Sequence, residues 1–392
     1  MCYAIPGKVT AISGNLVTVD YFGETKKARN DFQKIGIGDY IYAQGGFVIN
    51  KIAEKDALEI LESWKELFQE LKKIDLKLSR PTNNLFQIAN NTRQKHLGNS
   101  CCVHGIIEFS NYCQDNCLYC GIRRDNIDLS RYRMPVDEIV ATVDHAVNQL
   151  GFKALVLQSG EDLWYTDEKL VELVNKIREK CGVLLFMSLG ERSFETYKKL
   201  YAAGARGVLL RFETSNPKLY QDLRPGRQLE TRLELSRQIR DLGYLLITGS
   251  IIGLPGSTDE DYLNDLKIAK SLAPEMYSFG PLVPHPKTPL SLQPTIKLVT
   301  ILEVIARCRI MDPEGKIVVT TALETLYGDN GKRQGLMSGA NSLMLNVTPM
   351  KYRKLYDIYP NRAGMEKEIN NQIKETLSLL RELGRAPTDL GI

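Results

Sequence analysis

No hydrophobic run in this sequence is long enough to span a membrane, and one of the longest, residues 183–187, is far too short. A large excess of positive charge is also missing, because 51 Lys and Arg residues face 47 Asp and Glu residues. The 30 glycines and 16 prolines follow no period, which excludes a collagen-like rod. Residues 1–9 lack the basic and apolar segments of a secretory signal. We therefore predict a cytosolic protein whose partners are neither membranes nor nucleic acids.

The composition is that of a folded globular protein. Hydrophobic residues make up 43% of the 392 residues and charged residues 25%, which is enough apolar surface to form a core. This length predicts two or three domains, or one small domain and a large barrel. In a reducing compartment the eight cysteines are thiols rather than disulfides. We therefore consider them first as candidates for metal or redox chemistry.

The first 80 residues have the pattern of a separate small domain. Short apolar runs separated by glycine-containing turns predict a small closed β-barrel. The predicted strands are residues 8–12, 16–21 and 39–43. An amphipathic helix begins at Asp56, and the charged stretch 72–80 ends it and leads into a linker. We assign residues 1–78 to this domain and residues 79–392 to a second one.

From residue 103 onward, apolar strands alternate with amphipathic helices. The predicted strands are residues 104–109, 154–158, 183–189, 207–212, 245–252, 276–281, 316–322 and 342–347. Eight such strands over about 250 residues predict an α/β fold, a (β/α)8 barrel. An open doubly wound sheet is the alternative, but no glycine-rich dinucleotide fingerprint follows the first strand. In a barrel, catalytic residues lie at the carboxyl ends of the strands.

Three cysteines follow the first of these strands, Cys113, Cys117 and Cys120, at spacings of four and three residues. Three thiolates can each bind one corner of a four-iron cluster and leave the fourth iron open for a small molecule. A zinc ion usually takes four protein ligands, and no fourth Cys or His lies at a suitable spacing nearby. The alternative is that the three cysteines pack as small hydrophobic side chains. Because this spacing rarely arises by chance, we predict one 4Fe–4S cluster.

This loop, with Tyr119 before its last cysteine, resembles the loop of the radical S-adenosylmethionine (SAM) enzymes. The resemblance implies that the open iron binds the amino and carboxylate groups of SAM and that Tyr119 lies near the adenine. It also implies that an electron, from a donor such as ferredoxin or flavodoxin, cleaves SAM into methionine and a 5′-deoxyadenosyl radical. A closed barrel suits this chemistry because it keeps the radical away from water.

Polar residues end several of the later strands. They are Gln158, Gly160 and Glu161 after the second strand, Ser188 and Glu191 at the third, and Arg211 and Glu213 at the fourth. A glycine permits close backbone approach, and a carboxylate can meet the ammonium group of SAM. A single acidic residue is more often solvated or structural. Charges that repeatedly end apolar strands of a barrel indicate a site.

From about residue 85 to its end, the chain resembles the HydE family of FeFe-hydrogenase maturases, a group that is also similar to biotin synthase and methylornithine synthase. The motifs that carry the resemblance include LQSGED, SLGER, LRFETSNP and GPLVPHPKTPL. The resemblance implies that Ser188, Glu213 and Arg232 contact SAM, with Gln158 and Glu161 close by. It also implies that the substrate cavity is lined by Arg211, Met276, Thr320 and Thr321.

Two departures from the HydE pattern are visible. Phe212 stands where that family commonly has a histidine. Many of its members also carry a second set of cysteines near the C-terminus, and residues 361–392 contain none. We therefore expect a single cluster.

The first 75 or so residues resemble the HupF/HypC family of small chaperones, which carry an iron–cyanide–carbonyl unit during NiFe-hydrogenase assembly. The resemblance rests on the segment MCYAIPGKV at residues 1–9, on the later GDY and GFVI segments and on the acidic helix. It implies that Cys2 binds the iron fragment, because a thiolate suits iron and a near-terminal position lets a partner reach it. Gln44 stands where the family usually has a histidine, which leaves a second protein ligand open.

The remaining cysteines and histidines carry less information. Core packing is the better interpretation of Cys101, Cys102, Cys181 and Cys308. We expect structural roles for His96, His104 and His145. His285 follows the sixth strand, so a role in the cavity is open.

Together the two resemblances predict a radical SAM enzyme of hydrogenase metallocofactor assembly. Its substrate would be a small molecule or an organometallic iron fragment, and hydrogenase assembly proteins would be its partners. The first alternative is an amino-acid mutase similar to methylornithine synthase, for which Cys2 is dispensable. The second is an iron-cofactor carrier or scaffold whose barrel no longer catalyses a reaction.

Overall fold

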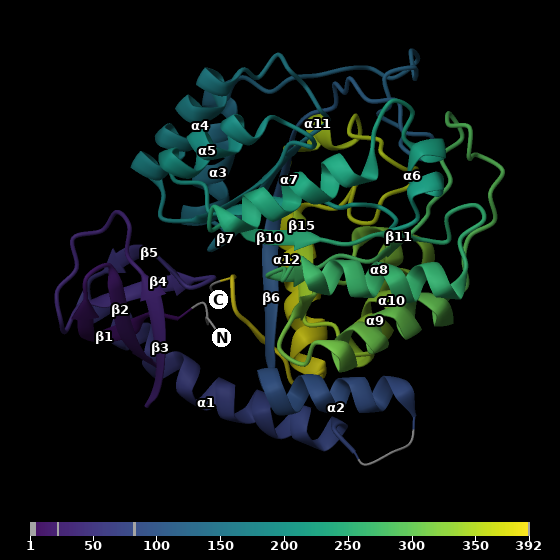
Figure 1. The fold of residues 1–392 in the computed structure, drawn as a ribbon. Coiled ribbons are helices and arrows are strands. Elements are labelled where there is room, and N and C mark those ends of the chain that lie inside the picture. The colour runs from purple at the N-terminus through teal and green to yellow at the C-terminus, as the bar shows by residue number, and fades with distance from the viewer. Residues whose placement is uncertain (1–4, 22, 81–83, 391–392) are drawn as a thin grey trace.

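A computed structural model describes residues 5–21, 23–80 and 84–390 as two barrels joined by helices (Figure 1). The small barrel, drawn in purple, lies beside the larger one. Helix α1 (Glu54–Leu78) leads from the small barrel toward α2 (Leu85–Leu97) beneath the larger barrel.

The small barrel is a closed sheet in the order β1-β2-β3-β5-β4. Its strands are β1 (Gly7–Ser13), β2 (Leu16–Tyr21), β3 (Glu24–Arg29), β4 (Tyr40–Gln44) and β5 (Phe47–Ile52). Val9, Val19 and Ile41 fill its interior, and Trp64 of α1 packs against them. The predicted barrel, its three predicted strands and the helix are confirmed. Two further strands, β3 and β5, were not predicted, and the sequence of β3, ETKKAR, has no apolar alternation.

The larger barrel contains parallel strands in the order β14-β12-β10-β9-β8-β7-β6-β15. Its two ends meet, because the N–H of Val319 donates to the carbonyl of Ser342 at 2.9 Å and a parallel bridge joins Val318 to Ser342. The predicted (β/α) barrel is therefore confirmed. The strands are β6 (Ser100–Ser110), β7 (Ala154–Ser159), β8 (Leu184–Ser188), β9 (Gly207–Leu209), β10 (Leu245–Thr248), β12 (Met276–Tyr277), β14 (Lys316–Ile317) and β15 (Ser342–Asn346).

Amphipathic helices cover the outside of this barrel. They are α3 (Val136–Asn148), α4 (Asp167–Lys180), α5 (Phe194–Ala203), α6 (Pro217–Leu223), α7 (Leu229–Asp241), α8 (Asp259–Ser271), α9 (Leu298–Met311) and α10 (Thr321–Met337). Side chains such as Thr166, Ser193 and Thr258 accept a hydrogen bond from the first turn and so fix where α4, α5 and α8 begin. Across the described residues, no helix combines the length and the apolar character needed to cross a bilayer.

The C-terminal segment returns to the lower end of the larger barrel, where its strands begin. After α11 (Met350–Arg353) and α12 (Ile369–Glu382), the short strand β16 (Ala386–Pro387) pairs with the start of β6. A second pair of short strands, β11 (Ile251–Ile252) and β13 (Gly280–Pro281), extends the opposite end. The tail therefore lies far along β6 from the loop that carries the cluster cysteines.

The small barrel docks on this lower end of the larger barrel. Tyr42, Phe47 and Ile49 form one apolar cluster with Phe186 and Ile247 of the larger barrel. The turn between β4 and β5 fits closely against the starts of β8 and β10, since a Cβ on Gly45 would come within 2.4 Å of Leu245. This apolar contact fixes the small barrel at the end of the larger barrel that faces away from the cluster loop.

Ionic contacts add to this docking. Asp31 accepts hydrogen bonds from Arg29 of the small barrel at 2.8 Å and from Arg206 of the larger barrel at 2.9 Å. Further along, Asp75 of α1 pairs with Arg93 at 2.6 Å and with Arg385 at 3.3 Å. The charged stretch predicted as the end of the helix and a linker is helical up to Leu78, and the end of α1 is held against the larger barrel.

Candidate functional site

A cavity of about 350 Å³ opens at the carboxyl ends of the parallel strands. It lies at the end of the larger barrel opposite the small barrel. Most of the site residues expected from the sequence line it, and they come from six separate segments of the chain. These are Cys113, Cys117, Tyr119, Cys120, Gln158, Gly160, Glu161, Ser188, Arg211, Glu213, Arg232, Thr320 and Thr321.

Two of the expected residues do not line this cavity. Glu191 lies just behind the wall, where its carboxylate pairs with Arg232 at 2.8 Å. Met276 is fully buried in the apolar cluster at the lower end of the larger barrel, together with Phe186 and Ile247. Cys2 lies outside the described residues.

The cysteine loop is held from both sides by close backbone contacts. The N–H of Glu161 donates to Sγ of Cys113 at 3.4 Å. A Cβ on Gly160 would come within 2.2 Å of the carbonyl oxygen of Tyr112, so only glycine lets the end of β7 approach the loop this closely. On the other side, the N–H of Gly121 donates to the carbonyl of Ile358 at 2.9 Å. The loop therefore has a defined shape before any cofactor binds.

The three sulfur atoms are not gathered as tightly as the ligands of a single ion. Ligands of one tetrahedral zinc ion lie about 3.8 Å apart when all are sulfur. Within the described part of the chain, Cys113, Cys117 and Cys120 do not form a group whose donor atoms all lie within 4.8 Å of one another. All three cysteines line one cavity, and three thiolates from one loop can each bind one iron of a four-iron cluster.

Burial makes these thiols weak acids in the absence of metal. It raises the pKa of Cys113 to about 12 and raises the pKa values of Cys117 and Cys120 as well. Iron must therefore displace a proton from each thiol as it binds. The residues present fit a 4Fe–4S cluster with one iron that has no protein ligand.

Next to the loop, three carboxylates are balanced by three arginines. Arg232 contacts Glu191 and lies 3.8 Å from Glu161, and both carboxylates were expected from the sequence. Three further members of this charged wall were not predicted, namely Asp115, Arg224 and Arg227. Arg224 pairs with Asp115 at 2.5 Å, and the burial of both side chains makes this contact a fixed part of the loop.

Glu213 occupies an unusual backbone conformation four residues after the end of β9. Its φ of 67° lies in the left-handed region, which costs a non-glycine residue about 1–3 kcal/mol. Its Oε2 is buried without a hydrogen-bond partner and lies 3.2 Å from Arg211. Strain of this kind is retained where a side chain must point in one direction, and here the side chain faces the cavity.

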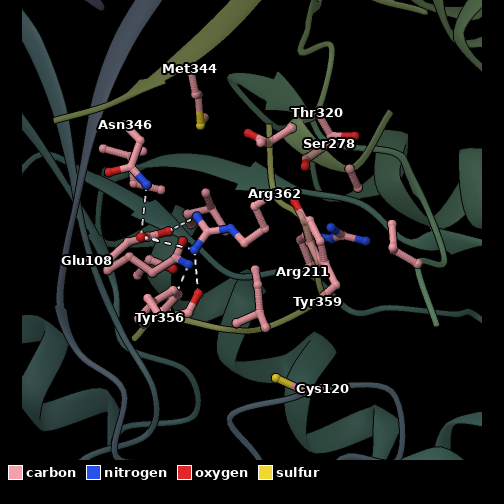
Figure 2. Close-up of a pocket in the computed structure, with 18 of the residues that line it drawn as sticks. Glu108, Cys120, Arg211, Ser278, Thr320, Met344, Asn346, Tyr356, Tyr359 and Arg362 are labelled. Carbon is pink, nitrogen blue, oxygen red and sulfur yellow. Dashed lines mark hydrogen bonds and ion pairs between the residues drawn. The ribbon is translucent and has the colours of Figure 1, made fainter. Parts of the chain in front are cut away.

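Figure 2 shows the deeper part of the cavity, away from Cys120. Glu108 of β6 forms an ion pair with Arg362 and accepts a hydrogen bond from Asn346 at 3.0 Å. Gln158 donates to the hydroxyl of Tyr356 at 3.0 Å. Arg211 lies in the same wall, and its Nε is buried without a hydrogen-bond partner.

Several of these deeper residues were missed by the sequence analysis. They are Glu108, Ser278, Met344, Asn346, Tyr356, Tyr359 and Arg362. Glu108 could have been found, because it is a charged residue inside an otherwise apolar strand. His285, for which a cavity role was open, instead contacts Asp357 at 2.9 Å behind the cysteine loop.

Three family models match successive parts of the chain. Residues 1–64 match the HupF/HypC family, residues 107–269 the radical SAM superfamily, and residues 278–386 the Biotin and Thiamin Synthesis associated domain. The order of these matches follows the order of the two barrels along the chain.

Individual relatives agree with these matches. The chain is 40% identical over 335 residues to the FeFe hydrogenase maturase subunit HydE of Thermotoga maritima, covering 85% of this chain and 95% of that one. It is 28% identical over 347 residues to 3-methylornithine synthase of Methanosarcina acetivorans, covering 87% and 97% of the two chains. The solved structure of a methylornithine synthase has a TM-score of 0.67 at 25% identity, covering 82% of this chain and 97% of that one.

Proposed function

Because this chain belongs to the HydE family of radical SAM enzymes, we propose that it acts on an iron-bound or sulfur-bound substrate in hydrogenase assembly and that its HupF/HypC domain carries the iron fragment. The observation that supports this most is the cavity itself, which joins the three cysteines to a second polar region in one closed barrel. Members of the radical SAM superfamily use a 4Fe–4S cluster and SAM.

The part of the cavity next to the loop is proposed to bind the cofactors. Cys113, Cys117 and Cys120 would hold the cluster, which when bound supplies the electron that cleaves SAM. Glu161, Glu213 and Arg232 line this part of the cavity, where the two carboxylates would meet the positive groups of SAM and the guanidinium would meet its carboxylate. Gln158, Gly160 and Ser188 line the space between these charges, Glu191 orients Arg232 from behind, and Tyr119 packs near Ile251, where the adenine is expected.

The deeper part of the cavity is proposed to bind the substrate. Arg211 faces it with a buried Nε that has no partner, and Arg362 lies across from it in an ion pair with Glu108. Thr320 and Thr321 add hydroxyl groups to the same wall. Each guanidinium lies beside a carboxylate, Arg211 beside Glu213 and Arg362 beside Glu108, so this wall offers paired polar groups that can hydrogen-bond a small substrate. Met276, expected here from the resemblance, would act only through the packing of the cavity floor.

The small barrel is proposed to carry iron at Cys2, which falls within its family match. The small barrel contacts the lower end of the larger barrel, where its strands begin. This position supports exchange of iron at that lower end rather than at the opposite end, where the cysteine loop lies. We also propose that ferredoxin or flavodoxin reduces the cluster and that hydrogenase assembly proteins exchange the iron fragment.

Anaerobic reconstitution of the full chain tests this function. With reductant and SAM, the enzyme should release methionine and 5′-deoxyadenosine, and infrared spectra of the protein isolated with its cellular ligand should show cyanide and carbonyl bands. The 28% identity to 3-methylornithine synthase makes an amino-acid mutase the second candidate. Lysine-derived products without cyanide or carbonyl bands would favour that candidate and contradict the maturation role.

A further inference from the structure

At the lower end of the larger barrel, opposite the proposed active site, three side chains with metal-binding groups converge. Cys102 and His104 lie on β6, and Asp389 lies in the tail just after β16. One donor atom from each lies within 4.8 Å of the other two. All three side chains are buried, with exposed fractions of 4%, 3% and 4%.

These side chains face the interior of the barrel. Ile106 and Glu108 line the cavity higher up the same strand, and alternate residues of a strand point to the same side. His104 and Cys102 therefore lie one and two steps below Ile106, the lowest residue of this strand that lines the cavity. Phe186 stacks against the His104 ring at 5.4 Å, which fixes the orientation of the imidazole.

We propose that Cys102, His104 and Asp389 bind one divalent transition-metal ion of the Fe²⁺, Co²⁺ or Zn²⁺ type. Nε2 of His104 lies 3.3 Å from Oδ2 of Asp389. Two ligand atoms at about 2.05 Å from a tetrahedral ion are about 3.3 Å apart, so this pair already has the spacing of two ligands of one ion. A thiolate, an imidazole and a carboxylate together favour these metals over Mg²⁺ or Ca²⁺, which take oxygen ligands.

Polar groups around the three ligands lack partners of their own. Nδ1 of His104 is buried without a hydrogen bond, although a buried polar atom left unpaired costs about 1–3 kcal/mol. Ser342, which pairs with Cys102 across the sheet, also has a buried Oγ without a hydrogen bond. Three protein ligands leave a fourth position on the ion, and Ser342 or a further ligand can approach it.

The surrounding charges are compatible with a dication. A thiolate and a carboxylate together carry two negative charges, which a divalent ion balances. Thr388 contacts both groups, with Oγ1 at 3.4 Å from Sγ of Cys102 and 3.0 Å from Oδ2 of Asp389. The ammonium of Lys316, which acts electrostatically on both Cys102 and Asp389, is paired with Glu275.

The site lies where the two barrels meet. Gln44 of the small barrel is fully buried and donates through Nε2 to the carbonyl of Thr388 at 3.0 Å, beside Asp389. A role in receiving iron from the small barrel rests on the proposed function, whereas the metal site itself does not.

Cobalt binding tests the site directly. The full-length chain with Cys2→Ser, Cys113→Ala, Cys117→Ala and Cys120→Ala, which removes the proposed iron ligand of the small barrel and the absorbance of iron–sulfur clusters, is titrated anaerobically with Co²⁺. We expect one Co²⁺ per chain, with the thiolate-to-cobalt charge-transfer absorption of a tetrahedral site. Adding Cys102→Ser or His104→Gln should abolish this absorption, whereas Cys101→Ser should retain it, because Cys101 packs on the opposite side of the strand.

The same experiment contains the results that would overturn the proposal. No cobalt absorption in the starting chain, or equal absorption after Cys102→Ser and His104→Gln, would leave only a hydrogen-bonded polar cluster. If a variant fails to fold, the starting chain still tests the proposal. Addition of Zn²⁺ to that chain must abolish the cobalt absorption and raise the unfolding temperature of the protein. These readouts do not depend on hydrogenase maturation, so failure here is distinguishable from failure of the proposed function.

Discussion

The backbone N–H of Glu161 donates to Sγ of Cys113 at 3.4 Å, which links the end of β7 to the first cysteine of the loop. The side chain of the same residue contacts Arg227 at 2.8 Å. Glu161 therefore connects the cysteine loop with the charged wall of the cavity. Any ligand that binds this wall lies directly beside the three thiols.

The first prediction concerns the cluster. Replacing Cys113, Cys117 and Cys120 with alanine should remove about four iron atoms per chain and abolish reductive SAM cleavage, because the remaining groups in the loop cannot hold iron. Iron analysis, visible absorbance and product assays measure this. Cys181→Ala is a matched control, since Cys181 is also a buried thiol but lies at the end of α4. A reducible four-iron cluster in the triple variant would show that the assignment is wrong.

The second prediction concerns SAM. Glu213→Ala and Arg232→Ala should each weaken SAM binding by about 10- to 100-fold, since a hydrogen bond to a charged group contributes about 1.5–3 kcal/mol. Iron content should stay the same, because neither residue is a cluster ligand. Equilibrium binding of SAM to the reconstituted protein is the measurement. Arg237→Ala on the exposed face of α7 is the control, and unchanged affinity in both test variants would exclude them from the site.

The third prediction distinguishes a residue that contacts the substrate from one that contacts SAM. Arg211→Ala removes a half-buried guanidinium that lines the cavity and lies 3.2 Å from the Glu213 carboxylate. We expect SAM cleavage without substrate to continue at a similar rate, while hydrogenase maturation in the cell falls by about 10-fold or more. Arg211→Lys should restore only part of the activity, because an ammonium group cannot form the bidentate hydrogen bonds of a guanidinium group. Loss of cleavage and maturation together would instead place Arg211 at the SAM site.

The fourth prediction concerns the docking of the small barrel and its dependence on pH. Burial opposes the charge of Asp31, but hydrogen bonds from Arg29 and Arg206 outweigh it and lower the pKa of the carboxyl. The stabilisation is therefore present above the ordinary carboxyl pKa and is lost as the pH falls through the lower folded value. Asp31→Asn should cost about 1 kcal/mol of unfolding free energy at neutral pH.

Thermal or denaturant unfolding at several pH values measures this effect. The difference between the native chain and Asp31→Asn should shrink toward zero once the pH falls below the lowered pKa of Asp31, where both side chains are uncharged. Asp137→Asn, at an exposed position of α3, is the control and should show almost no difference. A difference that persists unchanged in acid would exclude the ionic contact as its cause.

Local patterns in the sequence predicted the parts of the site that depend on nearby residues. Cys113, Cys117 and Cys120 are recognisable because one loop must hold all three ligands. Glu161 and Glu213 are recognisable because each follows a strand directly. The two barrels were predicted for the same reason, since apolar periodicity is a local property.

The parts of the site that the sequence did not predict depend on contacts between segments that are distant in the chain. Arg224 reaches Asp115 from a loop more than a hundred residues later, and no spacing rule connects the two positions. Arg362 reaches Glu108 in the same way. The docking of the small barrel also could not be predicted, because it depends on how Gly45 fits the starts of two strands in another domain.

The most direct test of the whole account is infrared spectroscopy of the chain isolated anaerobically from cells that make a hydrogenase, compared with its Cys2→Ser variant. The account predicts cyanide and carbonyl bands in the native protein, their loss in Cys2→Ser together with loss of hydrogenase maturation, and uncoupled SAM cleavage that stays intact. Normal maturation by Cys2→Ser, or a native protein without these bands that still matures hydrogenase, would contradict the proposal that the small barrel carries iron.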